Sequence, residues 1–131
     1  MALLLDTCAF LRLIWDDRRL PARARELIAD AGNPLFLSAV SIWEATNKHA
    51  QGKLPVYTKE PAWQHFVTQR DRHDIAALPL DEQAIRHLGN LPPLHKDPFD
   101  RLLICQAIEH GLGIVTPDEA IRQYPVKTLW D

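Results

Sequence analysis

Four carboxylates of this chain stand beside strongly apolar segments, where a lone charge is costly. Asp6, for example, directly follows the run Leu3-Leu4-Leu5. A charge that is withdrawn from water has to be paired with an opposite charge or bound to a metal ion. Carboxylate ligands suit a hard divalent cation such as Mg²⁺, with Mn²⁺ as the alternative. We therefore interpret four acids as one site that folding assembles: Asp6, Glu44, Asp100 and Asp118.

Two of these acids also have ordinary structural explanations. Asp6 is well placed to cap a following helix, although its position directly after three leucines argues for more. Glu44 lies four residues before Lys48, which is the spacing of an ion pair on a helix surface. Taken alone, Glu44 fits that surface pair better than it fits a site.

The other two acids have explanations of the same kind. In the segment from Asp97 to Asp100, the first aspartate is a natural N-cap and the following proline suits the first helical position. Asp100 then falls where the helix dipole favours an acid. Asp118 lies in the segment Thr-Pro-Asp-Glu, which has the composition of a turn. The prediction of a site therefore depends on the joint placement of the acids.

That placement follows from the elements that the sequence predicts. Five short apolar segments are typical of buried strands, namely residues 3–5, 35–37, 76–80, 114–116 and 126–129. The amphipathic segments between them predict helices that begin near Thr7, Pro21, Ser38 or Ser41, Pro61, Asp81 and Asp97, and a short helical turn over residues 118–123. Strands that alternate with helices predict an α/β fold, in which helices cover both faces of a mainly parallel sheet.

In a sheet of this kind, ligands bind beyond the carboxyl ends of the strands. Asp6 and Asp118 follow the predicted first and fourth strands, so both fall at this edge. Glu44 and Asp100 lie within the first turns of helices that start or pass near the same edge. We expect the four side chains to converge there.

The properties of the whole chain fit a small globular protein. Its 131 residues predict a single domain, residues 1–131, and the 47% of hydrophobic and 24% of charged residues argue against disorder. A net charge of −2 means that attraction to a nucleic acid has to come from a local patch or a metal ion. Cys8 and Cys105 fit neither a zinc site nor a disulfide framework. We find no signal peptide and no membrane span, and expect a cytoplasmic protein.

Other polar residues give weaker signals. His95 precedes the acidic helix start and is within reach of a substrate phosphate, but a histidine in a loop is usually solvated. A basic group offers contacts to a phosphate backbone, although such charges more often form a solvated helix face: Arg18, Arg19, Arg23, Arg25, Lys48 and Lys53. A phosphatase with an Asp-x-Asp motif would need an acid where Cys8 stands, which argues against that class.

Four segments of the chain resemble the PIN domain family, and within it the bacterial toxins of VapC type. They are Leu-Leu-Leu-Asp-Thr at residues 3–7, Ser-Ile-Trp-Glu at 41–44, His-Lys-Asp-Pro-Phe-Asp-Arg-Leu-Leu at 95–103 and Thr-Pro-Asp at 116–118. They occur in family order and span nearly the whole chain. Asp97 departs from the minimal family pattern, and we interpret it as a helix cap, with a water-mediated metal contact or an interaction that holds Arg101 as alternatives. Thr116 matches a hydroxyl residue that often precedes the last acid, and we expect it to hydrogen-bond a carboxylate.

The resemblance implies a three-layer α/β/α sandwich with a mainly parallel five-stranded sheet. It also implies an acid cluster of Asp6, Glu44, Asp100 and Asp118 that binds Mg²⁺ and hydrolyses phosphodiester bonds of RNA, as in a metal-dependent endoribonuclease. It further implies the toxin of a type II toxin–antitoxin pair, a small antitoxin protein as partner, and a homodimer. The alternative that the sequence leaves open is a PIN-like binding module without turnover, which acts only by capturing a partner.

Overall fold

All five strands of the structure, a computed structural model that describes all 131 residues, run parallel in one sheet. The strands are β1 (Leu3–Leu5), β2 (Leu35–Ser38), β3 (Ala76–Leu78), β4 (Gly113–Val115) and β5 (Thr128–Leu129). Their order across the sheet is β3-β2-β1-β4-β5, so β1 is central. In the register of the sheet, Leu4 lies between Phe36 of β2 and Ile114 of β4. The predicted α/β fold with a parallel five-stranded sheet is confirmed.

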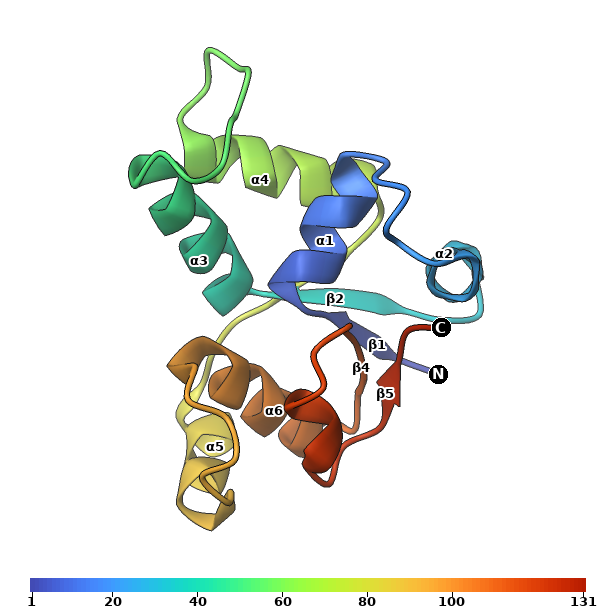
Figure 1. Cartoon of the computed structure of the whole chain (residues 1–131), viewed down its shortest axis with the longest axis vertical. Helices are drawn as coiled ribbons and strands as arrows, with labels where there is room; N and C mark the ends of the chain where they lie inside the picture. Colours follow the sequence, from blue (N-terminus) through green and yellow to red (C-terminus); the bar gives the residue numbers. More distant parts are fainter.

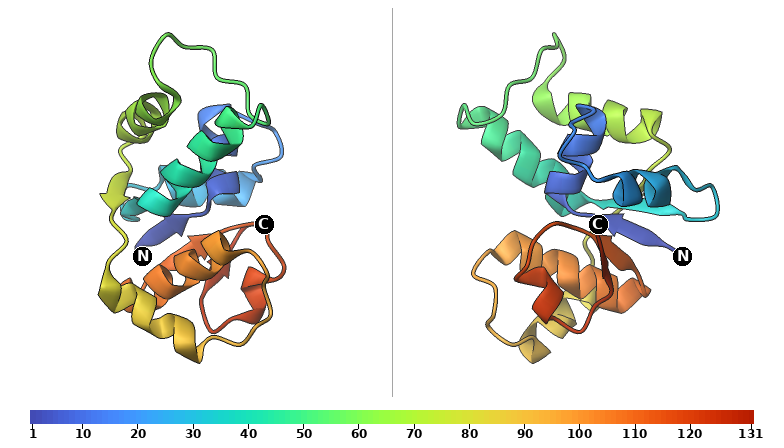
Figure 2. Two further views of the ribbon diagram at one scale, coloured as in Figure 1. Left: turned by 90° about the vertical axis from the view of Figure 1, so that its left-hand side faces the viewer. Right: turned by 45° about the vertical axis from the view of Figure 1, so that its right-hand side comes forward.

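Six α-helices cover the two faces of this sheet (Figure 1). They are α1 (Thr7–Ile14), α2 (Ala22–Ala29), α3 (Ala39–Ala50), α4 (Ala62–Arg72), α5 (Glu82–Ile85) and α6 (Pro98–His110), joined by the 3₁₀-helices η1 (Arg86–Asn90) and η2 (Ile121–Gln123). Helices α1 to α4 lie on one side of the sheet, and α5 and α6 lie on the other, a division that the turned views of Figure 2 preserve. This arrangement is the predicted three-layer sandwich. None of the helices has the length and apolar character needed to cross a membrane.

The leucines of β1 are fully buried because both faces of this strand are covered. Leu3 and Leu5 pack with Phe10 in one hydrophobic cluster, beneath the layer of α1 to α4. Leu4 points to the opposite face and packs with Ile104 of α6 in a second cluster. Successive side chains of a strand alternate between its faces, so a strand covered on both sides needs an unbroken apolar run. Asp6 comes immediately after this run and is itself only 4% exposed.

Some element boundaries differ from the sequence-based predictions. Thr7 is the first residue of α1 and not its cap. Asp6 takes that role, with an extended backbone and a carboxylate that accepts a hydrogen bond of 2.7 Å from the Ala9 N–H. Ser38, and not Ser41, caps α3. The strand expected over residues 76–80 ends at Leu78, where the following proline, Pro79, has no N–H to donate to a neighbouring strand.

Candidate active site

The strand order creates a crevice at the carboxyl edge of the sheet. From β1 the chain moves to β2 and β3 on one side, and it then crosses over to β4 and β5 on the other. Connections that leave neighbouring strands in opposite directions open a crevice between those strands. Asp6 follows β1 directly, and its N–H donates to the Val115 carbonyl at the end of β4, with an N–O distance of 3.1 Å. Asp118 follows β4 by three residues, so both acids flank this point.

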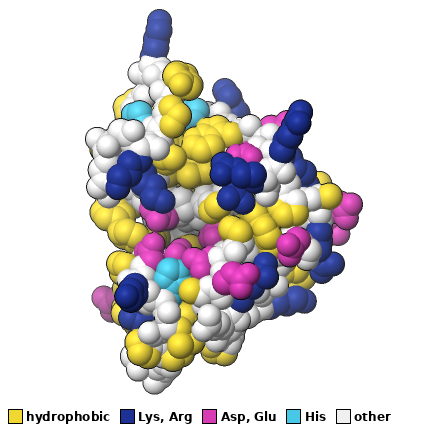
Figure 3. All heavy atoms as spheres, in the orientation of Figure 1, with side chains coloured by type: hydrophobic (Ala, Val, Ile, Leu, Met, Phe, Trp, Pro, Cys, Tyr) yellow, Lys and Arg dark blue, Asp and Glu magenta, His cyan; other side chains and the backbone are white.

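A cleft of about 450 Å³ opens here, and acids from separate segments of the chain line its walls. These acids are Asp6, Glu44, Asp97, Asp100 and Asp118. Three basic side chains line the same cleft, namely Arg12, Arg19 and Lys48. Figure 3 shows acidic side chains gathered around a hollow in this face, with a histidine among them and lysine or arginine side chains on the rim. The structure therefore brings together all four acids that the sequence singled out, with Asp97 beside them.

Asp6 forms the buried end of the cleft, and Thr116 supports it. The Thr116 hydroxyl is fully buried and donates a hydrogen bond to Oδ2 of Asp6, which is the kind of contact expected of this residue. The same hydroxyl oxygen accepts the Asp118 N–H at 3.0 Å, so one threonine links two acids. Burial raises the pKa of Asp6 to about 6, although the hydrogen bonds from Thr116 and Ala9 act in the opposite direction.

The start of α6 supplies two further acids. Asp97 is the N-cap of this helix and accepts a hydrogen bond of 2.8 Å from the Phe99 N–H, as the cap interpretation requires. Asp100 lies in the first turn, and its side chain is 16% exposed. Burial, followed by the negative charges of Asp97 and Asp6, raises the pKa of Asp100 to about 7, while His95 lowers it. Burial is the main cause of the raised pKa values of Asp6 and Asp100, and the neighbouring acids add to it, so the ionised form of both carboxylates is disfavoured at this end of the cleft.

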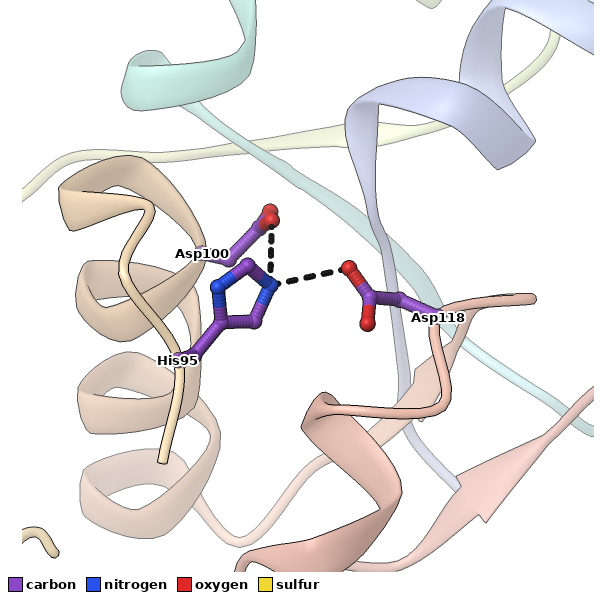
Figure 4. Close-up of side chains that lie close together, drawn as sticks. All are labelled: His95, Asp100 and Asp118. Atoms are coloured by element: carbon purple, nitrogen blue, oxygen red, sulfur yellow. Dashed lines mark hydrogen bonds and ion pairs between the residues drawn. The ribbon is translucent and has the colours of Figure 1, made fainter. Parts of the chain in front are cut away.

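His95 lies between two of the acids, as Figure 4 shows. Its Nε2 atom is 3.0 Å from Oδ2 of Asp100 and 2.9 Å from Oδ2 of Asp118. Its other ring nitrogen, Nδ1, accepts the Asp97 N–H at 3.0 Å. The expectation of a solvated histidine is therefore wrong, because the side chain is only 13% exposed. Burial would lower the pKa of His95, but the hydrogen bond and charge of Asp118 and the charge of Asp100 outweigh burial and raise this pKa. Protonation of Nδ1 would break the hydrogen bond from the Asp97 N–H. The loss of that bond opposes the rise in the pKa of His95.

Asp118 is held through both of its carboxylate oxygens. Oδ2 faces His95, and Oδ1 accepts the N–H groups of Ala120 at 2.8 Å and Ile121 at 3.4 Å. Burial would raise the pKa of Asp118, but the hydrogen bonds from His95 and Ala120 outweigh it and keep this pKa below its usual range. Asp118 therefore stays ionised without a cation more readily than Asp6 or Asp100 does.

Glu44 satisfies both of the explanations that its sequence position allowed. Its carboxylate lies 3.6 Å from the Lys48 ammonium, at the spacing of a helical ion pair. However, its side chain is only 10% exposed, against 43% for Lys48, and it lines the cleft. The pair is therefore a feature of the cleft wall and not of a solvated helix face.

The donor set of the cleft suits a hard divalent cation. Carboxylate oxygens of Asp100 and Asp118 lie within 4.8 Å of each other, beside a ring nitrogen of His95, and carboxylate oxygens are the ligands that Mg²⁺ and Mn²⁺ take in proteins. Asp6 lies deeper, and each of its oxygens already accepts one hydrogen bond. Sequence reasoning missed the bridging position of His95, and its only local signal was the short distance along the chain to Asp97 and Asp100.

Comparison with known proteins identifies the family of this chain and agrees with its fold. The family model of the PIN domain matches residues 3–127. The chain belongs to the PIN domain family.

This PIN domain has the fold of VapBC2 from Rickettsia felis bound to a DNA fragment from its promoter, with a TM-score of 0.71, 17% identity and 100% of both chains covered. DNA-bound VapBC from Salmonella typhimurium gives a TM-score of 0.68 at 17% identity, with 98% of this chain and 97% of that chain covered. VapBC-1 from nontypeable Haemophilus influenzae gives 0.65 at 19% identity with the same coverage. Comparison with curated protein sequences gave no match.

Proposed function

We propose that this PIN domain is a metal-dependent endoribonuclease that hydrolyses phosphodiester bonds of RNA. The observation that carries the proposal is the convergence of five carboxylates from four segments of the chain on one cleft that also has a basic rim. PIN domains are generally nucleases, and an acid-lined cleft short of positive charge favours a divalent cation. A cation held there would supply Lewis-acid chemistry, polarising the scissile phosphate and acidifying an attacking water.

The residues of the cleft have three roles in this proposal, and Asp118 and Glu44 are candidates for two of them. Asp6, Glu44, Asp100 and Asp118 hold the cation, preferably Mg²⁺ or Mn²⁺. Asp118 or Glu44 orients the attacking water or accepts its proton, because a general base must be ionised and within reach of that water. The basic residues on the rim hold phosphates on either side of the scissile bond, through the charge-assisted hydrogen bonds that cationic side chains form with phosphate: Arg12, Arg19 and Lys48.

We further propose that this ribonuclease is the toxin of a type II toxin–antitoxin pair. The support is the fold that it shares over almost its full length with the toxin–antitoxin proteins VapBC2, VapBC and VapBC-1. A small antitoxin protein would then be its partner, the active unit would be a homodimer, and the protein would act in the cytoplasm, where its RNA substrate is found.

The test is cleavage of a structured RNA by the purified chain with Mg²⁺, with Mn²⁺ and with a chelator. Asp100→Asn and Asp6→Asn keep the side-chain shape, and the second variant retains an acceptor for the cap of α1. We expect each to reduce cleavage by about two orders of magnitude or more. Glu26→Gln, which removes one negative charge from the exposed surface of α2, is the matched control and should cleave like the parent.

Cleavage that survives both substitutions would exclude this cleft as the active site. A parent chain that binds the ion but cleaves no RNA would instead favour the second candidate, a binding module that retains the acids without turnover. Size measurement by sedimentation separately tests the homodimer.

A further inference from the structure

We propose that His95 is a positioning residue of the cleft, whose Nε2–H donates to Asp118 and fixes it beside Asp100 in the arrangement that binds the cation. This inference rests on the proposed function of the cleft. It assigns His95 the role of a hydrogen-bond donor and not that of a metal ligand.

The hydrogen bonds of the ring determine which nitrogen carries the proton. Nδ1 accepts the Asp97 N–H at 3.0 Å, so it must present a lone pair there. In the neutral ring the proton is then on Nε2, the atom that faces Asp100 and Asp118 at 3.0 and 2.9 Å. A histidine that binds a metal does the reverse, because its second ring nitrogen donates to a carboxylate, a carbonyl or water. The ring as placed here cannot present a lone pair to a cation through Nε2 without losing the bond from Asp97.

The loop that carries His95 is fixed by a single buried side chain. The Tyr124 hydroxyl accepts the N–H groups of Leu94 at 3.1 Å and His95 at 2.8 Å, and it donates to the Pro92 carbonyl at 2.8 Å. These three bonds use the full capacity of a hydroxyl group. Tyr124 is only 3% exposed and packs in the hydrophobic cluster that contains α6 residues. The imidazole is therefore anchored at its backbone by the buried Tyr124 and at its ring by Asp97, the N-cap of α6.

A donor at this position solves a problem that two neighbouring carboxylates create. Like charges in a partly desolvated cleft repel each other and would move apart unless something between them offers a proton. The Nε2–H donates to Oδ2 of Asp118, whose other oxygen is held by the Ala120 and Ile121 N–H groups, while Oδ2 of Asp100 lies 3.0 Å from the same ring nitrogen. Asp118 is thus oriented beside Asp100 before any cation arrives. Groups that orient metal ligands in this way typically contribute about 10- to 100-fold to metal affinity.

The experiment measures Mn²⁺ and Mg²⁺ affinity of the whole chain by isothermal titration calorimetry, together with the imidazole nitrogen resonances of the metal-free protein by NMR. His95→Leu removes the donor, whereas His95→Gln retains an N–H at a similar distance from the backbone. We expect His95→Leu to weaken binding about 10- to 100-fold, and His95→Gln to recover most of that loss. Tyr124→Phe removes the anchor without touching the acids, so it should give a smaller loss in the same direction. In the parent, NMR should show a His95 ring that is protonated on Nε2 and not on Nδ1.

The matched control is His87→Leu. The Nε2 atom of His87 lies 2.9 Å from the Glu109 carboxylate, a similar contact outside the cleft, so its loss should leave metal affinity unchanged. Parent-like or tighter binding by His95→Leu would overturn this inference alone, because it would mean that the ring is dispensable or competes with the ion. A proton on Nδ1 would also overturn it, and that measurement needs no variant to fold. A parent chain that binds neither ion would overturn the proposed function, and this inference with it.

Discussion

Single residues of this cleft serve the fold and the site at the same time. Asp6 caps α1 through one oxygen and accepts the Thr116 hydroxyl through the other. Asp97 caps α6 and also raises the pKa of Asp100. Glu44 pairs with Lys48 and lines the cleft. The capping roles of Asp6 and Asp97 and the ion pair of Glu44 are therefore present in the structure, and they do not compete with a role in the site.

Thr116→Val tests how far one hydroxyl supports two acids. The change keeps the shape of a fully buried side chain, removes a hydrogen bond to Asp6 and leaves the Asp118 N–H without its acceptor. We expect a loss of about 1–3 kcal/mol in the free energy of unfolding, measured in urea. The pKa of Asp6 should rise further, because the lost hydrogen bond lowers it.

Thr46→Val provides the matched control for this prediction. Its Oγ1 atom is buried without a hydrogen-bond partner, so replacing it with a methyl group removes no bond. The free energy of unfolding should stay the same or increase. Equal losses in the two variants would contradict the role that we assign to Thr116, because they would reflect only the loss of a hydroxyl.

Contacts between positions distant along the chain are those that the sequence did not predict. For Thr116, the family resemblance led us to expect a bond to a carboxylate, but it did not indicate which one. The Thr116 hydroxyl reaches Asp6 across 110 positions, and the Tyr124 hydroxyl reaches the His95 N–H across 29. No spacing rule relates such pairs, since they depend on how strands and loops pack. The acids were predictable because each of them lies at the end of an element that local patterns already define.

At the scale of elements, strand ends and helix starts place the acids. The apolar run of β1 ends at the sheet edge and leaves Asp6 there, and the Asp-Pro start of α6 places Asp100 one turn into the helix. Strand periodicity and helix caps are local features, so the sequence predicted these elements. It left the α1 cap open between Asp6 and Thr7, because Thr and Asp are similarly good N-caps and a sequence does not show which of two neighbours has the extended backbone; in the structure Asp6 has it.

The α6 start also allows the cap and the charge of Asp97 to be separated. Asp97→Asn keeps an acceptor for the Phe99 N–H, whereas Asp97→Ala removes it. We expect a loss of about 0.5–2 kcal/mol in the free energy of unfolding for the alanine variant and little loss for the asparagine variant. Both changes should lower the pKa of Asp100, because they remove the charge of Asp97, which raises that pKa more than any other neighbouring charge does. NMR titration of the Asp100 carboxyl carbon gives that pKa. An asparagine variant that is stable but binds no metal would instead make Asp97 a ligand.

At the scale of the whole molecule, the sheet order concentrates negative charge at one point of a chain whose net charge is only −2. The metal-free protein should therefore lose stability as the pH rises from about 4 to 7. Folding raises the pKa of Asp6 from 3.8 to about 6 and that of Asp100 to about 7, so the native state binds more protons than the unfolded state in this range. Unfolding free energies measured in urea across these pH values should fall, and Asp100→Asn should reduce the slope. A free energy that rises through this range in the parent would contradict the prediction.

A bound cation should reverse this pH dependence, because it requires the ionised carboxylates that protons otherwise neutralise. A ligand present at 100 times its dissociation constant stabilises the native state by about 2.7 kcal/mol. For domains near this size, each kcal/mol of added stability raises the melting temperature by roughly 2–8 °C. We expect a clear rise with saturating Mn²⁺ at pH 7.5 and a much smaller one at pH 5, in melting scans of the same protein. Asp100→Asn should lose most of the shift, and Glu26→Gln, on the exposed surface of α2, should keep it. An equal shift in melting temperature in Asp100→Asn and Glu26→Gln would mean that the ion binds elsewhere on the surface. An equal shift at both pH values would mean the same, because protons and metal compete in this pH range only at carboxylates with raised pKa values.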